Sequence, residues 1–67
     1  MFTKKDIKDQ LEKLRHVEIE MYDKYHRMAQ EIKDPEYKAI FNRLAKEENE
    51  HKEEFDQLLK LLEHWKN

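Results

Sequence analysis

The sequence predicts an all-α protein: an antiparallel two-helix hairpin that dimerises into a four-helix bundle. Apolar residues recur every three or four positions along both halves of the chain, glycine is absent, and the single proline lies near mid-chain. Spacing of this kind places the apolar side chains on one face of each helix. With 67 residues, we expect one structural unit, 1–67, that needs association or a bound metal for stability.

The first helix is expected over residues of about 4–33. Thr3 suits the N-cap position, and Asp6 three residues later forms an imperfect capping box, because the motif prefers Glu or Gln there. The mostly apolar positions on one face of this helix, which we call the stripe, alternate in steps of four and three. They are Ile7, Leu11, Leu14, Glu18, Met21, Tyr25, Met28 and Ile32.

The second helix is expected over residues of about 35–65. Asp34 can cap it, and Pro35 suits its first position, where a missing N–H costs nothing. The connection between the two helices is so short that they must be antiparallel neighbours. The stripe continues through Tyr37, Phe41, Leu44, Glu48, His51, Phe55, Leu58, Leu62 and Trp65.

Composition and charge exclude several classes of protein. The chain has no cysteine, which excludes disulfides, Cys-ligated zinc and iron–sulfur centres. The net charge is only −2, with 14 basic residues interleaved among 16 acidic ones, so we expect no nucleic-acid partner. No membrane-length apolar run and no signal peptide are visible, so a soluble cytoplasmic protein without a membrane partner is expected.

Three ionisable residues interrupt the apolar stripe: Glu18, Glu48 and His51. Glutamate is almost never buried without a partner. In the expected hairpin these residues occupy two adjacent layers near the middle of both helices, so they converge in space. A bound metal ion explains the cluster best, and a polar layer that fixes helix pairing is the alternative.

A dimer completes both the core and the ligand set. One hairpin supplies two carboxylates and one imidazole, and it leaves its stripe in contact with water. Two hairpins supply four carboxylates and two imidazoles, and Glu48 and His51 form the Glu-x-x-His pattern of ferritin-like di-iron bundles. Two divalent cations cancel the four buried charges. We therefore expect two iron ions per dimer, with manganese or zinc as alternatives.

The segments 18–29 and 45–59 resemble the two metal-binding helices of rubrerythrins and of encapsulated ferritins, and the likeness extends over about residues 7–62. The resemblance implies a ferritin-like four-helix bundle in which Glu18, Glu48 and His51 are metal ligands. It implies that Tyr25, seven residues after the first ligand, lies beside the site. It also makes Glu20 a candidate for the point where metal enters, although Val17 leaves that site incomplete.

The function implied by the resemblance is that of a ferroxidase, which oxidises Fe²⁺ with O₂ or peroxide at a site shared across a homodimer. One alternative is a peroxide reductase with an external electron donor, since the chain lacks the cysteines of a rubredoxin-type iron site. The other is a non-catalytic interaction module whose metal fixes the dimer. A larger ring and packaging inside an encapsulin-type shell also stay open, although residues 61–67 are interpreted as the helix end rather than as a docking tail.

Overall fold

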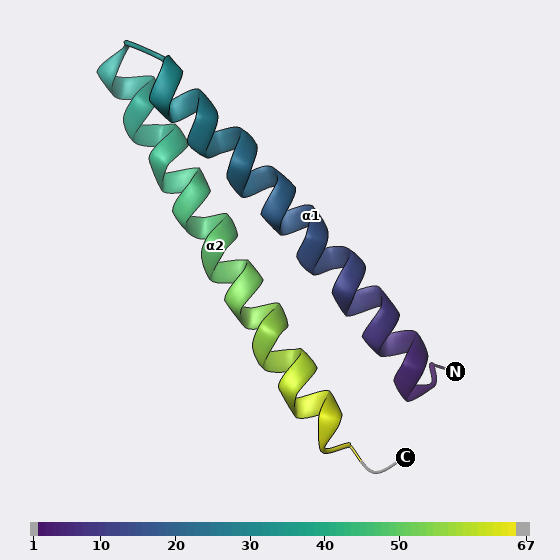
Figure 1. The fold of residues 1–67 in the computed structure, drawn as a ribbon. Helices are drawn as coiled ribbons and strands as arrows, with labels where there is room; N and C mark the ends of the chain where they lie inside the picture. Colours follow the sequence, from purple (N-terminus) through teal and green to yellow (C-terminus); the bar gives the residue numbers. More distant parts are fainter. Residues whose placement is uncertain (1, 66–67) are drawn as a thin grey trace.

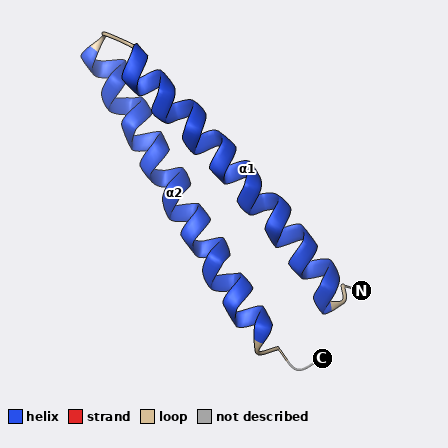
Figure 2. Ribbon diagram, viewed as in Figure 1, coloured by secondary structure: helices blue, strands red, loops and turns tan. Residues whose placement is uncertain are grey.

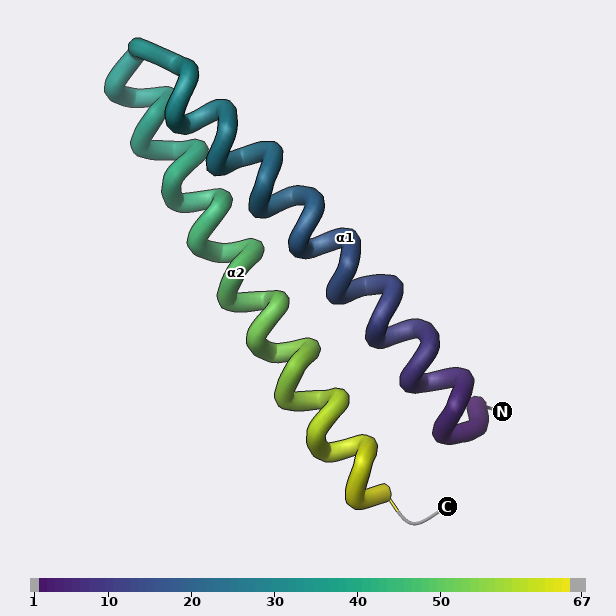
Figure 3. Tube along the Cα trace, in the orientation of Figure 1, coloured from purple at the N-terminus to yellow at the C-terminus, as the bar shows by residue number. Residues whose placement is uncertain are grey.

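The computed structural model describes residues 2–65 as two long α-helices joined by a short turn (Figure 1). Helix α1 spans Lys4–Glu31 and helix α2 spans Pro35–Glu63, and this part of the chain contains no strand (Figure 2). The helices lie side by side and antiparallel, in a rod of 51 × 15 × 14 Å (Figure 3). The predicted all-α hairpin is confirmed. Met1, Lys66 and Asn67, which the predicted unit includes, lie outside the described residues.

Both helices begin where the sequence predicts. The Thr3 hydroxyl accepts a hydrogen bond from the Asp6 backbone N–H, and the Asp6 carboxylate accepts one from the Thr3 backbone N–H, which completes the capping box. The Asp34 carboxylate accepts hydrogen bonds from the N–H groups of Glu36 and Tyr37, and Pro35 opens the helix. These contacts satisfy N–H groups that have no partner inside a helix.

Both helices end about two residues earlier than expected. The first stops at Glu31, because Ile32 has already turned to an extended backbone (φ −77°, ψ 139°). Pro35 disfavours helical geometry only at Asp34, two residues further on. The second stops at Glu63, where the His64 N–H bonds to the carbonyls of Leu61 and Leu62. Hydrogen bonds to the carbonyl three residues earlier, as in a 3₁₀-helix, are common in the last turn of an α-helix.

The hairpin alone buries little of its apolar surface. Among the described residues only Ala29, Ala45 and Leu62 are buried. The accessible area is 5721 Å², whereas a compact protein of this mass exposes about 4,600 Å². Polar contacts also join the helices: Arg15 pairs with Asp56, and the Lys4 ammonium donates to the Glu63 carbonyl. The structure therefore leaves a substantial apolar surface uncovered.

That surface lies on one side of the line where the helices meet. We call it the apolar face, and it contains the exposed side chains of Leu14, Met28, Tyr37, Leu58 and Trp65, together with His51. Near the open end of the hairpin it is hollowed by a groove of about 330 Å³, whose lining includes Ile7, Leu58, Leu61 and Trp65.

The opposite side of the hairpin is polar. We call it the polar face, and it contains Arg15, Tyr22, Asp23, Lys52 and Asp56. Neighbouring positions of a helix differ by about 100° around its axis, so Leu14 and Arg15 lie on opposite sides of the contact line. Neither described helix is long and apolar enough to cross a membrane.

Candidate metal centre

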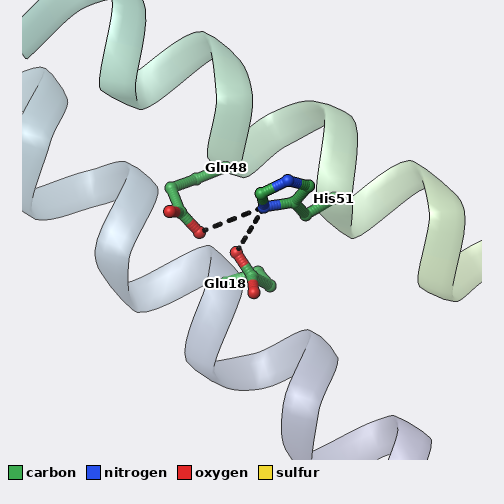
Figure 4. Close-up of side chains that lie close together, drawn as sticks. All are labelled: Glu18, Glu48 and His51. Atoms are coloured by element: carbon green, nitrogen blue, oxygen red, sulfur yellow. Dashed lines mark ion pairs between the residues drawn. The ribbon is translucent and has the colours of Figure 1, made fainter.

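The three polar residues of the stripe meet halfway along the hairpin (Figure 4). Glu18 comes from the middle of α1, while Glu48 and His51 lie one turn apart on α2 and therefore share a side of that helix. The His51 Nδ1 atom lies 3.6 Å from the Glu18 Oε2 atom and 3.9 Å from the Glu48 Oε2 atom. One ligand atom from each residue falls within 4.8 Å of the other two. The predicted convergence of these residues is confirmed.

The two carboxylates are poorly satisfied. Their side chains are only 19% (Glu18) and 13% (Glu48) exposed, and the Oε2 atom of each is buried without a hydrogen-bond partner among the described residues. A buried carboxylate oxygen without a partner is costly, more so than a neutral group. His51 differs, because half of its side chain is exposed, toward the apolar face. The imidazole is thus the most exposed of the three side chains.

This donor set fits a first-row divalent cation. Oxygen and nitrogen ligands bind such ions at about 2.0–2.2 Å, so ligand atoms on opposite sides of an ion lie about 4.4 Å apart. The observed limit of 4.8 Å requires only a small closure of the side chains. Carboxylate and imidazole together suit iron, manganese or zinc. The two orphaned oxygens are the observation that favours a cation here, because a cation would satisfy both at once.

Tyr25 and Glu20, the other predicted site residues, lie outside this group of ligand atoms. Tyr25 is half-buried, and its ring stacks on that of Phe41 with 6.3 Å between centroids. The Glu20 carboxylate pairs with His16 at 2.8 Å on an exposed part of α1. The role of Tyr25 beside the metal and the role of Glu20 in metal entrance stay predictions.

The polar face also contains a groove that the hydrophobic pattern does not predict. It has a volume of about 290 Å³ and reaches Glu18 and Glu48 from the side opposite His51. Its wall contains Arg15 and Tyr22 of α1 and Lys52 of α2. A sequence signal was present: Arg15, Tyr22 and Ala29 recur every seven residues beside the stripe, as do Ala45, Lys52 and Leu59. This second track forms the other edge of the helix contact.

Comparison with known proteins identifies a protein family. The profile of the rubrerythrin family matches residues 1–59. No curated protein and no solved structure matches the chain. The matched segment covers most of the chain and includes all three residues of the candidate centre. The chain therefore belongs to the rubrerythrin family, and a rubrerythrin-type domain implies iron binding.

Proposed function

We propose that two hairpins associate through their apolar faces and form a di-iron ferroxidase centre between them. The observation that carries this proposal is the group of Glu18, Glu48 and His51, with two buried carboxylate oxygens that have no hydrogen-bond partner within residues 2–65. Membership of the rubrerythrin family supports iron as the metal.

The spacing of the apolar face supports a two-fold dimer. Tyr37 and Trp65 both lie 14 positions from His51, and Leu44 and Leu58 both lie seven positions from it. A two-fold axis through the His51 layer therefore brings the open end of one hairpin against the turn end of its partner. The exposed apolar residues of one end then meet those of the other, and both imidazoles lie inside the bundle. This arrangement yields four carboxylates and two imidazoles for two metal ions.

In the proposed reaction Fe²⁺ is the substrate. Two Fe²⁺ ions each lose one electron, and O₂ takes up two electrons and two protons to give H₂O₂. With peroxide as oxidant, one H₂O₂ takes up the two electrons and two protons, and two molecules of water form. The Glu18 and Glu48 carboxylates offset the charge of the ions, and His51 supplies a neutral nitrogen donor. Because all three residues bind metal in their deprotonated forms, iron binding weakens as the pH falls.

Tyr25 is proposed to tune this oxidation without holding the metal. It follows Glu18 by two turns, and side chains of a helix lean toward its N-terminus, hence toward the ligand layers. The substitution Tyr25→Phe keeps the ring on Phe41 and removes only the hydroxyl. We expect unchanged metal affinity and a changed rate or product distribution of Fe²⁺ oxidation.

A peroxide reductase is the second candidate, and the family match is the observation that favours it. Such an activity needs electrons from another protein, because the chain has no cysteine to hold a second iron site. The discriminating measurement is turnover: a reductase consumes peroxide repeatedly when supplied with a reduced electron carrier, whereas a ferroxidase stops when Fe²⁺ is exhausted.

The ferroxidase proposal is tested by anaerobic Fe²⁺ loading followed by exposure to air. We expect near-ultraviolet absorbance of ferric iron to appear faster than in protein-free buffer, and Glu48→Ala to remove the acceleration. Zinc loading of the same protein gives the reference for a purely structural metal. If the wild-type chain oxidises Fe²⁺ no faster than buffer and zinc supports the same oligomer, the metal is structural and the ferroxidase proposal fails.

A further inference from the structure

Formation of the proposed dimer changes how solvent reaches the metal ligands. The apolar face, where His51 is half exposed, becomes covered by the second hairpin. Glu18 and Glu48 lie on the contact line between the helices, and the groove on the polar face also reaches them. This groove is lined from both helices and lies away from the apolar face, so it stays open in the dimer.

The charges around the groove favour a cation over an anion. Its lining contains three carboxylates, those of Glu18, Asp23 and Glu48. It contains two basic groups, and one of these, Arg15, is already paired with Asp56 beside the groove. Lys52 is the remaining basic group of the lining. With Asp56 included, four acidic groups face two basic ones, so the local field attracts divalent metal.

We propose that this groove is the route by which divalent metal reaches Glu18 and Glu48 in the assembled dimer. Asp23 is the attracting group on its wall, and Lys52 is the opposing charge that slows entrance. The inference rests on the proposed dimeric site and adds to it a direction of approach. It differs from a route past Glu20, whose carboxylate lies on another side of α1 and is paired with His16.

The experiment measures metal association rather than activity. Co²⁺ is mixed rapidly with metal-free protein at a concentration at which sedimentation shows it to be dimeric, and the visible absorbance of the bound ion reports the association rate and the final stoichiometry. The test variants are Asp23→Asn and Lys52→Gln. The matched controls are Glu20→Gln, which neutralises an acid on the same helix outside the groove, and Lys46→Gln, which neutralises an exposed lysine of α2 outside it.

At low ionic strength we expect Asp23→Asn to slow association roughly two- to five-fold and Lys52→Gln to accelerate it by a similar factor, because a single charge near the route contributes only part of the total steering. Both effects should disappear near 1 M salt, where the screening length is about 3 Å. The two controls should change the rate little, and all four variants should bind the same amount of Co²⁺.

The inference is overturned if Glu20→Gln slows association as much as Asp23→Asn, or if neither groove variant changes the rate. In those cases unchanged Co²⁺ stoichiometry leaves the proposed centre standing, and only the route is wrong. If the wild-type dimer binds no Co²⁺, the proposed centre itself fails and the route fails with it.

Discussion

The two faces of the hairpin are built from the same helices, yet they suit different surroundings. The apolar face exposes large side chains, with Leu58 46% and Trp65 40% accessible. The polar face carries Arg15, paired with Asp56 across the helices, and Lys52. Glu18 and Glu48 lie on the line between the two faces. One face therefore suits contact with protein and the other suits contact with water, and the candidate centre lies at their junction.

A charge placed on the apolar face should have the largest effect. Leu58→Lys would bury one ammonium group per chain in the proposed interface, and each such ion costs several kcal/mol. We expect the dimer dissociation constant, measured by analytical ultracentrifugation, to rise at least about 1,000-fold. Metal binding should be lost together with the dimer. The matched control is Gln57→Lys, on the exposed back of α2. A dimer that persists in Leu58→Lys would show that the apolar face is not the interface.

Removal of the imidazole should have the next largest effect. His51→Ala deletes the nitrogen donor that each chain contributes to the centre, and we expect metal affinity to fall at least about 100-fold, equivalent to about 2.7 kcal/mol. His26→Ala is the matched control, because Asp23 and His26 repeat the acid-x-x-His pattern away from the centre, where His26 stacks on Tyr22. Isothermal titration with Zn²⁺ measures both. Equal losses of Zn²⁺ affinity in the two variants would contradict the proposal that His51 is a metal ligand.

Neutralising the carboxylates should separate folding from metal binding. Without metal the two buried Oε2 atoms have no hydrogen-bond partner in the described part of the chain, so the double substitution Glu18→Gln and Glu48→Gln should stabilise the fold by roughly 1–3 kcal/mol while abolishing metal binding. The control pair Glu12→Gln and Glu50→Gln removes the same charge from exposed sites. Urea denaturation with and without Mn²⁺ gives both quantities. If, without metal, the substitutions at Glu18 and Glu48 lower the free energy of unfolding more than the control substitutions do, the two buried carboxylates do not repel each other as proposed.

The smallest effect lies outside both faces, at the start of α1. Thr3→Ala removes the N-cap hydroxyl and should cost about 1 kcal/mol of stability without changing metal affinity. Hydrogen bonds from the Thr3 backbone N–H, and then from its side chain, hold the pKa of Asp6 below its ordinary value. The stability that this lowered pKa reflects is present when the pH is above the ordinary pKa of Asp. It is lost as the pH falls through the lower pKa that Asp6 has in the folded protein. Thr3→Ala keeps the backbone N–H and loses a hydroxyl that accepts from an amide, so this variant should stay less stable than wild type at every pH. Asp6→Asn removes the charge instead, and its acid denaturation should converge with that of wild type at low pH; an Asp6→Asn difference that persists at low pH would contradict the capping box.

The sequence predicts much of the fold because local signals agree. The caps at Thr3 and Asp34, together with Pro35, locate both helix starts, and the absence of glycine leaves no other obvious break. The convergence of the three polar stripe residues also follows from the register of two antiparallel helices.

The polar face is harder to predict because the stripe gives only one edge of the helix contact. The second edge runs through Arg15, Tyr22 and Lys52, whose side chains are half-buried yet polar or charged, so hydrophobic periodicity does not distinguish them from surface residues. The pairing of Arg15 with Asp56 depends on the rotation of each helix about its axis. The sequence pattern predicts helix ends about two residues later than the structure shows. At Ile32 the backbone becomes extended without a glycine or proline at that position to signal the end of the helix.

In the proposed dimer each hairpin supplies only half of the ligands of the metal centre, and this sharing can be measured. Native mass spectrometry during a Zn²⁺ or anaerobic Fe²⁺ titration tests it directly, because it counts chains and metal ions in the same particle. We expect dimers carrying two metal ions, little metal on monomers, and a shift from monomer to dimer as metal is added, since a ligand that binds only the dimer stabilises it. Monomers that bind two metal ions tightly, or dimers whose abundance is independent of metal and that carry none, would contradict the shared centre.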